Sequence, residues 1–438
     1  MIHSISLKNY KCFEQCSIEM RPITLLLGPN NSGKSAIISS VKLLAQTVES
    51  YDKNVPILLH GKYGDFGTYK DLVNKNITSK KMTIKIESSY KPSTLSVKDP
   101  ERVSAHLTYS YKSSKKRVVL SNAIFFSNSI EQACFAWNEE TEKYYLKSIL
   151  GQEVDDHLTK KFKDRINFFH FLPNHMWYGE DQSSLSKKSK NQIRAIETLQ
   201  PKLKQLYLSL SKLDYLSALR LPPSRTYSYS GELHKKIGAS GENAMTIFAM
   251  NYTSKGRKGK AILEALTSWL GRSGIADSVA IRDIASRFFE IQIKHPSSDL
   301  PQNIADVGFG VSQVLPVLVG GMNCEANTSF LVEEPEIHLH PRAQAELGDF
   351  FVNLKERNVQ VIAETHSEHL VLRLLQAVAQ GKLNPSDVIF YSISTNRNGC
   401  NAEKVEVDSK GMFVGGWPQG FFPERLEEAK KLALAREA

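Results

Sequence analysis

In LLLGPNNSGKS, residues Leu25–Ser35, four residues have a spacing that indicates how this chain folds. Gly28, Gly33, Lys34 and Ser35 form the pattern G-x-x-x-x-G-K-S, which is that of a phosphate-binding loop. The glycines let backbone N–H groups curl around a polyphosphate, because no Cβ stands in the way. In such a loop the lysine reaches the β- and γ-phosphates and the serine hydroxyl holds Mg²⁺.

The residues on either side of the loop support this interpretation. Ile23–Leu27 is a short apolar run, as a buried strand requires. Ile37, Val41 and Leu44 follow at positions i, i+4 and i+7, on one face of a helix whose N-terminus would point at the anion. The alternative is a chance match in a turn rich in glycine and serine. We predict that the following residues bind a nucleoside triphosphate: Asn30, Asn31, Ser32, Gly33, Lys34 and Ser35.

A second apolar strand, Phe330–Val332, is followed by two acids, Glu333 and Glu334. Proteins with this loop place a Mg²⁺-holding carboxylate at the end of a neighbouring strand, and Glu333 occupies that position. We expect Glu334 to be the general base that polarises the attacking water. Successive strand residues point to opposite faces, so both acids serve one site only if the strand ends there, as Pro335 indicates. The alternative is a strand that ends at an ordinary polar turn.

Two further segments carry candidate residues. Val361–Ser367 repeats the arrangement one strand later and places His366 at a strand end, where it could hydrogen-bond the γ-phosphate or orient the water. A single histidine is more often structural, which is the alternative. Asp306–Gln313 is a glycine-spaced turn that contains Ser312 and is followed by an apolar run. It is either a second anion cradle or a plain turn before a helix.

Composition and charge limit the class of protein. The chain has 438 residues, of which 41% are hydrophobic and 23% charged, as in ordinary globular proteins. No apolar run is long enough to span a bilayer, so we expect no membrane partner. Five scattered cysteines indicate reduced thiols and a cytoplasmic location.

The positive charge is concentrated in the middle of the chain. The net charge is +10, and residues 151–260 hold 19 lysines and arginines against 10 aspartates and glutamates. Two clusters stand out: Lys187, Lys188 and Lys190, and then Lys255, Arg257, Lys258 and Lys260. Such a segment either attracts nucleic acid or an acidic protein, or is a solvated lysine-rich surface.

The sequence predicts an α/β fold in four parts. We expect residues 1–72 to form the first part of a nucleotide-binding head, and residues 73–150, in which polar and apolar residues alternate, to form an antiparallel β lobe. Residues 151–300 should be a basic, mainly helical insertion, with a helical pattern interrupted by Pro201. Residues 301–438 should complete the head, so the nucleotide-binding residues are split between the two ends of the chain.

Taken together, the motifs resemble those of the ABC-type ATPases of the SMC, RecF and OLD group. ISLKNYKCF at 5–13 is similar to that group's opening, and GFGVSQVLPVL at 308–318 to its signature segment. LVEEPEIHLHP at 331–341 is similar to the Walker B and D-loop segment, and ETHSEHL at 364–370 to the switch-histidine segment. The resemblance implies an ABC-type head that binds ATP with Mg²⁺ and hydrolyses the ATP.

The resemblance also implies roles for further residues and an assembly. Residues at the positions of Asn9, Tyr10 and Lys11 lie near the nucleotide base in that group. Two heads dimerise head to tail with ATP between the phosphate loop of one and the signature serine, here Ser312, of the other. We therefore expect a homo-oligomer, a dimer or a higher ring, whose active site is shared between subunits.

Two positions depart from the pattern of the group. Glu333 stands where an aspartate is usual, which could alter the geometry of the Mg²⁺ contact. The Q-loop glutamine has only a poor candidate, Gln46, which falls inside the helix that follows the loop.

Within the group, YLSALRLPPSRTYS at 215–228 and GGWPQGFFPE at 415–424 resemble the ATPase subunits of the bacterial anti-phage systems PARIS and, less closely, Septu. In those systems the ATPase works with a separately encoded nuclease. No strand ending in D-x-D follows His366, so we expect this chain to lack a nuclease of its own. Arg220 and Arg225 either touch phosphate or the partner head, or are ordinary ion-pair residues.

Three functions are compatible with these residues. Our hypothesis is an anti-phage ATPase that senses infection and controls a separate nuclease effector. The alternative is a RecF- or SMC-like DNA-binding ATPase of repair or recombination, in which the basic middle segment grips duplex DNA. A module that holds ATP without turnover is less favoured, because both Glu334 and His366 are present.

Overall fold

The chain folds into two units whose segments alternate along the sequence. The structure is a computed structural model. It describes residues 1–90, 101–162, 166–174, 186–229, 231–232, 234–253, 256–397, 399–417 and 435. Unit 1 contains Met1–Met20, Ser35–Leu213 and Asn396–Asn401, and unit 2 contains Arg21–Lys34, Asp214–Thr395 and the described residues from Ala402 onward.

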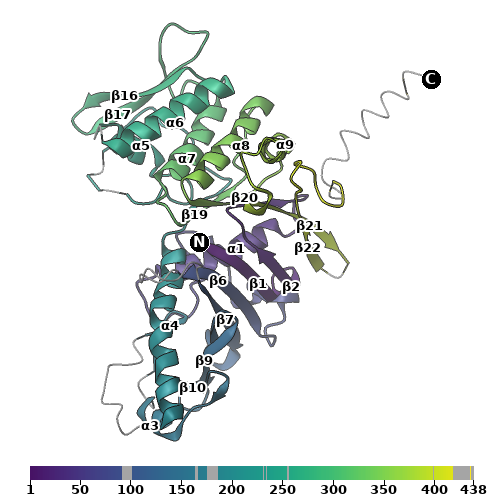
Figure 1. Cartoon of the computed structure of the whole chain (residues 1–438). Coiled ribbons are helices and arrows are strands. Elements are labelled where there is room, and N and C mark those ends of the chain that lie inside the picture. Colours follow the sequence, from purple (N-terminus) through teal and green to yellow (C-terminus); the bar gives the residue numbers. More distant parts are fainter. Residues whose placement is uncertain are drawn as a thin grey trace. The chain divides into compact units, whose positions relative to one another are not determined.

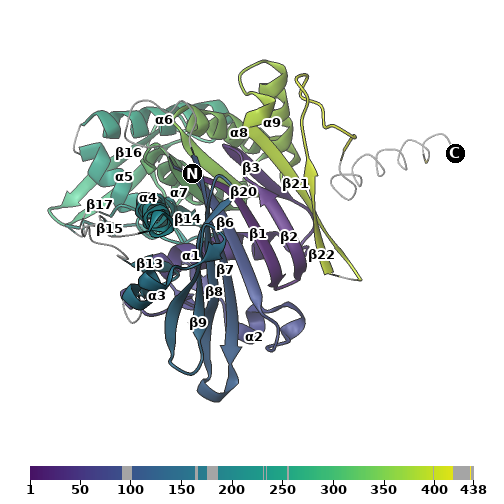
Figure 2. The same ribbon diagram turned by 60° about the horizontal axis from the view of Figure 1, so that its bottom comes forward.

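Unit 1 is built on an eight-stranded antiparallel sheet of order β11-β10-β9-β8-β7-β6-β1-β2. Figure 2 shows several of these strands side by side. Buried and less buried residues alternate along β7, as the polar and apolar alternation of the sequence predicts. The strands are β1 (Ile2–Tyr10), β2 (Phe13–Glu19), β6 (Met82–Tyr90), β7 (Glu101–Lys112), β8 (Arg117–Ser127), β9 (Ile130–Asn138), β10 (Lys143–Ile149) and β11 (Gln152–Glu153).

One long helix of unit 1, α4 (Lys187–Ser211), packs against β6, β7, β9 and β10. It runs beside the sheet in Figure 1. Pro201 does not interrupt α4, contrary to the sequence-based expectation, because this residue lies on the exposed face, where water can satisfy the carbonyl that it leaves unpaired. The other elements are α1 (Lys34–Val48), β4 (His60–Gly61), β5 (Gly64–Asp65), α2 (Tyr69–Leu72), α3 (Asp156–Phe162), β12 (Asn167–Phe169) and β13 (Leu172–Asn174).

Unit 2 is built on a six-stranded sheet of order β14-β19-β20-β3-β21-β22. The pairs from β14 to β21 are all parallel, and Figure 2 shows β20, β3 and β21 next to one another. Parallel strands are buried on both faces, which is why they read as continuous apolar runs. The strands are β3 (Ile23–Leu27), β14 (Asp214–Leu216), β19 (Thr328–Glu333), β20 (Val359–Glu364), β21 (Val388–Asn396) and β22 (Gly399–Val405).

Helices and a small second sheet complete unit 2. Helix α7 (Phe309–Asn323) is buried along almost its whole length, and Gly320 lets it approach Phe330 of β19 closely. The second sheet joins β15 (Tyr227–Ser228), β16 (Ser278–Ala285), β17 (Phe288–Lys294) and β18 (Gln302–Asn303). The remaining helices are α5 (Ala244–Thr253), α6 (Arg257–Ser273), α8 (Pro341–Glu356) and α9 (Glu368–Ala379).

The predicted α/β fold with an antiparallel β lobe is confirmed. Residues 151–300 read as a mainly helical insertion but also contain the strands β11–β17, and one of these, β14, belongs to the parallel sheet of unit 2. With only three residues, β14 is too short to leave a periodic signal in the sequence. Among the described helices, none combines the length and the apolar character needed to cross a membrane.

Candidate functional site: an acid–histidine cluster beside the phosphate-binding loop

The phosphate-binding loop connects strand β3 to helix α1. Every residue of β3 is buried, and the strand leads directly into Gly28. The φ of Gly28 is +143°, and a Cβ there would lie 2.2 Å from the carbonyl oxygen of Ile393, so only glycine fits. Gly33, immediately before α1, also has a positive φ of 108°. The loop backbone is therefore shaped by the two glycines that the sequence motif contains.

Lys34, the first residue of α1, is buried and points back into the loop. Its Nζ donates to the carbonyl oxygens of Gly28 and Pro29, each at 2.8 Å. Burial lowers the pKa of Lys34, and the nearby carboxylates of Glu364 and Glu334 oppose that shift. The ammonium is thus held in place by carbonyl groups and by acids that arrive on other strands.

Those acids stand at the ends of two adjacent parallel strands. Glu333 of β19 is in register with Glu364 of β20. Glu334, Glu364 and His366 each offer a ligand atom, and these atoms lie within 4.8 Å of one another; we call these three residues the acid–histidine cluster. Lys34 Nζ lies 3.7 Å from Glu364 Oε1, which joins the loop to the cluster.

The turn after β19 brings Glu334 to the cluster. Glu334 has a φ of +42°, a left-handed conformation that costs free energy in a residue with a side chain. Its backbone N–H donates to the Glu364 carbonyl at 2.8 Å, which continues the ladder between β19 and β20. The strand therefore ends between Glu333 and Glu334, and the two side chains no longer alternate simply across the sheet.

A buried carboxyl, that of Glu336, positions the backbone of His366. Glu336 Oε1 accepts hydrogen bonds from Thr365 Oγ1 at 2.7 Å and from the His366 N–H at 2.6 Å. Burial raises the pKa of Glu336. Burial, followed by the charge of Lys34, lowers the pKa of His366, so this imidazole is neutral at pH 7.

Three buried polar atoms around the loop have no hydrogen-bond partner within the described part of the chain. They are Ser32 Oγ, Glu336 Oε2 and His366 Nε2. Buried polar atoms are normally paired, and an unpaired one calls for an explanation such as a missing ion, water or ligand. A Cβ at Gly28 would not fit the loop, and the nearby carboxylates outnumber the single lysine, Lys34. Together with the three unpaired atoms, these features fit a bound phosphate and a divalent cation.

Glu333, the residue predicted to contact the metal, is half-buried and turned toward Tyr215 of β14. Burial raises the pKa of Tyr215, and the neighbouring Glu333 carboxylate raises that pKa further. Glu333 is not a member of the acid–histidine cluster. The structure thus places Glu364, a residue that sequence reasoning did not single out, near Lys34, and Glu333 beside a tyrosine.

Arg220 holds the backbone of this region together. It is only 8% exposed, and its guanidinium donates to the carbonyl oxygens of Gln313, Glu333 and Glu334 at 2.8–3.0 Å. Burial lowers the pKa of Arg220 to about 10. The sequence left open whether Arg220 contacts phosphate, the partner head or an acidic side chain. In the structure it contacts backbone carbonyls of the same chain, at the start of α7 and the end of β19.

Arg225, five residues later, is different. It is exposed and forms a two-pronged ion pair with Asp306, at 2.9 and 2.5 Å. Of the alternatives that the sequence left open for Arg225, the ordinary ion pair is the one observed.

The other loop residues are placed as follows. Asn30, Asn31 and Ser35 are exposed, and Ser32 and Lys34 are buried. Ser35 is the second residue of α1, so its hydroxyl stands at a helix N-terminus, where backbone N–H groups favour an anion.

The residues expected near the nucleotide base have other contacts in unit 1. Tyr10 is fully buried, and its hydroxyl bonds with Ser39 of α1 at 2.8 Å, so its ring is not presented to a ligand. Asn9 Nδ2 donates to the Lys81 carbonyl at 3.0 Å. Lys11 is half-buried with its Nζ over the Phe66 ring, 5.8 Å from the ring centroid.

Ser312, the expected signature serine, is near the start of α7. It lies in the first turn of α7, is 2% exposed, and donates its hydroxyl to the Phe309 carbonyl at 2.8 Å. In the single chain this hydroxyl therefore faces its own helix. The exposed residues of that segment are instead Gly308 and Phe309.

Gln46, the poor Q-loop candidate, is also structural. Its side chain donates to the Leu58 carbonyl at 2.6 Å and accepts from the Tyr63 N–H at 3.3 Å. It therefore fixes the backbone that follows α1 within unit 1.

Sequence reasoning missed three residues of this region: Glu364 and Glu336 entirely, and the backbone contacts of Arg220. A usable signal existed for Glu364, because it ends an apolar strand as Glu333 does. For Glu336 the signal was weaker, since an acid after a proline in a turn is common on protein surfaces.

The comparisons agree with this geometry. Residues 1–371 match the family model of the AAA ATPase domain. This chain belongs to the AAA ATPase domain family. The phosphate-binding loop lies within the residues that this family model matches, as do Glu334, Glu364 and His366.

One curated relative of the chain is called OLD nuclease. An OLD nuclease of Thermus scotoductus (strain ATCC 700910 / SA-01) is 20% identical over 378 residues, which make up 84% of this chain. The chain spans 59% of the length of that relative.

Solved structures similar to the chain are SMC heads. A SMC head bound to the C-terminal winged-helix domain of ScpA has 11% identity and a TM-score of 0.49, with coverage of 93% of this chain and 98% of that one. The SMC head domain of Thermotoga maritima has 11% identity, a TM-score of 0.40 and coverage of 93% and 99%.

Proposed function

We propose that this chain binds ATP with Mg²⁺ at the P-loop and hydrolyses the ATP. The observation that carries the proposal is the convergence of Lys34 with Glu334, Glu364 and His366 at one edge of the parallel sheet. A lysine in a glycine-shaped loop serves to hold phosphate oxygens. A carboxylate and a neutral imidazole beside it serve to polarise and orient a water molecule.

The residues divide into four roles. Lys34 and the loop residues Asn30–Ser35 hold the triphosphate. Glu334 accepts a proton from the attacking water. His366, neutral and with Nε2 unpaired among the described residues, contacts the γ-phosphate or orients that water. Ser35 and Glu333 hold Mg²⁺, and Glu364 is a further carboxylate within reach of the same region; Mg²⁺, when bound, neutralises charge on the phosphate oxygens.

Phosphate binding has to change the contacts of Lys34. Its Nζ donates to the Gly28 and Pro29 carbonyls, so the lysine must exchange at least one of these for phosphate oxygens. The carboxylates of Glu334 and Glu364 favour the charged lysine throughout this exchange. The carbonyl contacts of Lys34 therefore hold the loop until phosphate oxygens of the substrate replace them.

We further propose that two copies complete the site and that ATP turnover controls a separate nuclease in an anti-phage system. The support is the resemblance of the motifs to SMC, RecF and OLD ATPases, and of residues 215–228 to anti-phage ATPase subunits. A relative that is 20% identical over 378 residues is called OLD nuclease. Because Ser312 is buried, the partner's contribution would come from the exposed residues at the start of α7.

A DNA-binding ATPase is a second candidate, and one observation favours it. Three lysines of α4, Lys187, Lys188 and Lys190, are exposed at one end of the helix, as a phosphate-binding surface requires. Of the other basic cluster, Lys255 lies outside the described residues, as do the side chains of Arg257 and Lys258. Charge reversal of the three α4 lysines, compared with reversal of Lys75, Lys80 and Lys81, would separate the candidates through salt-dependent duplex binding.

Glu334→Gln tests the ATPase proposal. The amide keeps the shape of the side chain but accepts no proton, so we expect ATP binding to persist, turnover to fall about 100-fold or more, and larger assemblies to accumulate with ATP. Light scattering coupled to gel filtration measures the assemblies. Glu356→Gln, an exposed glutamate at the end of α8, is the matched control. Unchanged turnover in Glu334→Gln would refute the assigned base, and an unchanged mass with ATP would refute the shared site.

A further inference from the structure

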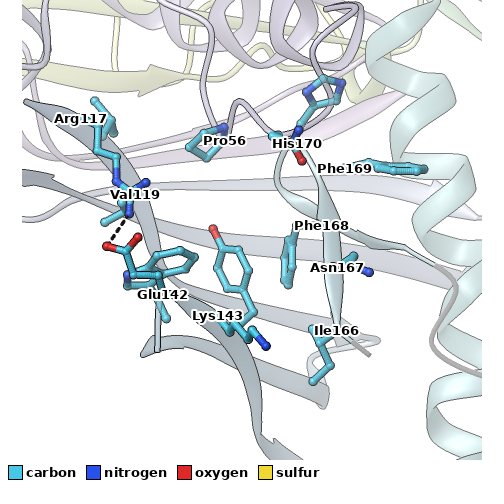
Figure 3. A pocket seen from close by; sticks show the side chains of 14 residues that line it. Pro56, Arg117, Val119, Glu142, Lys143, Ile166, Asn167, Phe168, Phe169 and His170 are labelled. Atoms are coloured by element: carbon cyan, nitrogen blue, oxygen red, sulfur yellow. Dashed lines mark ion pairs between the residues drawn. The ribbon is translucent and has the colours of Figure 1, made fainter. Parts of the chain in front are cut away.

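Unit 1 contains a cavity that shares no residue with the P-loop region. Its volume is about 510 Å³, within the range of small-molecule sites. It lies between strands β8–β10 and the hairpin formed by β12 and β13, with residues 54–56 along one side (Figure 3). All of its lining residues belong to the described part of unit 1. We call this cavity the aromatic pocket.

The walls of the aromatic pocket are rings. Trp137 of β9 and Tyr144 of β10 are opposite one another in the sheet, with ring centroids 4.9 Å apart. Tyr144 also contacts Phe168 of β12, at 4.2 Å between centroids. Phe168 is packed in turn against Phe135 at 5.4 Å, which holds its ring in place. A wall of fixed rings suits a planar aromatic ligand.

The mouth of the aromatic pocket is charged. Arg117 lies over the Trp137 ring, 5.6 Å from the centroid, and pairs with Glu142 at 3.1 Å, as the dashed line in Figure 3 shows. A guanidinium has five N–H donors, more than one carboxylate oxygen can use. Lys143 lines the same cavity. Both basic side chains are at the surface, where an anionic group could reach them.

Two amides lie near the rings. Asn54 and Asn167 line the cavity, are exposed, and make no side-chain hydrogen bond with any residue that the structure describes. The hairpin that carries Asn167 is anchored on the loop that carries Asn54. The His170 N–H donates to the Lys53 carbonyl at 2.7 Å, and His170 Nδ1 lies 3.2 Å from the Val55 carbonyl oxygen. Side-chain amides carried on an anchored backbone suit the edge of a nucleobase.

We propose that the aromatic pocket binds a purine nucleotide, with the base against Trp137, Tyr144 and Phe168 and the phosphate at Arg117 and Lys143. Free nucleotides and nucleotides within a single strand share this chemistry. A lipid chain or an aliphatic peptide would leave Arg117 and both amides without partners on binding, at a desolvation cost. The inference stands apart from ATP turnover, since none of these residues belongs to the acid–histidine cluster.

The test is calorimetry in a Lys34→Ala background, which removes the P-loop site. We expect AMP to bind with a Kd of about 1 mM or below, adenosine to bind at least about tenfold more weakly for want of the phosphate, and ribose 5-phosphate not to bind. Comparison with a hexamer of deoxyadenylate separates the two sources of the nucleotide. Tighter binding of the hexamer assigns the pocket to single strands, and equal or weaker binding assigns it to free nucleotides.

Matched variants assign the binding to the aromatic pocket. Arg117→Gln and Asn167→Ala should each weaken AMP binding, the first by about tenfold or more. Arg102→Gln should not, although Arg102 is an exposed arginine of the same sheet with an ion pair of 3.0 Å to Glu87. The proposal is overturned if AMP fails to bind, if Arg117→Gln binds AMP as the parent does, or if only an aromatic peptide competes for the pocket.

Discussion

The P-loop region of unit 2 and the aromatic pocket of unit 1 differ in where their charges lie. Lys34, Glu364, Glu336 and Arg220 are buried, each in contact with backbone or with an opposite charge. Arg117, Glu142 and Lys143, at the mouth of the aromatic pocket, are exposed. Water screens exposed charges, whereas a buried charge interacts strongly and is expensive to leave unpaired. Single substitutions should therefore have large effects on turnover or stability in the P-loop region, and smaller effects on ligand binding in the aromatic pocket.

Lys34→Ala should have the largest effect. It removes the ammonium that lies 3.7 Å from Glu364 Oε1, and we expect ATP turnover to fall about 10²–10³-fold. Nucleotide binding in the aromatic pocket should not change. Steady-state turnover and AMP calorimetry on the same preparation check both statements. Normal turnover in Lys34→Ala would refute the ATP site, and loss of AMP binding would show that the two sites are not separate.

Arg220→Lys should be next, because it combines burial with several contacts. One ammonium cannot reach the carbonyls of Gln313, Glu333 and Glu334 in the planar arrangement that the guanidinium uses. We expect the free energy of unfolding to fall by about 2 kcal/mol and turnover to fall with it, since Glu334 loses its fixed turn. Urea unfolding of the variant measures this. Wild-type stability would show that the arginine does not hold the turn.

The P-loop region could be anticipated from sequence to the extent that its signals are local. Wherever the motif of Gly28 to Ser35 follows a strand, its spacing predicts a loop shaped by glycines and then a helix. Acids and a histidine at strand ends meet because the carboxyl ends of parallel strands share one edge. These rules place Lys34, Glu334 and His366 together without knowledge of the rest of the chain.

Side-chain direction could not be anticipated, because tertiary packing decides it. Tyr10 turns to Ser39 and Ser312 to its own helix, and neither sequence segment contains that information. The aromatic pocket is a stronger case. Trp137, Tyr144 and Phe168 come from three strands, and their meeting depends on the register between β9 and β10 and on the fold of a short hairpin. Register between strands is set by the whole sheet.

Glu336→Gln gives a smaller effect that depends on pH. The pKa of Glu336 is raised in the folded protein. The stability that this carboxyl contributes is therefore fully present at a pH below the pKa of a glutamate in the unfolded chain, about 4.3. That stability is lost as the pH rises through the raised pKa of the folded protein. Glutamine does not titrate. The thermal midpoint of the variant should therefore increase relative to that of the wild type as pH rises from 5 to 8. A constant difference across this range would mean that the carboxyl is not protonated by burial.

Arg225→Ala should have the smallest effect and separates burial from location. Arg225 belongs to unit 2, as Arg220 does, but it is exposed, and its ion pair with Asp306 is in contact with water. Exposed ion pairs contribute little, because solvent and salt screen them. The Asn303 amide bonds to the backbone carbonyl of Arg225, which alanine keeps. We expect the thermal midpoint and ATP turnover of the variant to match those of the wild type. If Arg225→Ala instead lowered turnover as Arg220→Lys does, the arginine would act in the reaction or on a partner head, and burial alone would not explain why the two regions differ.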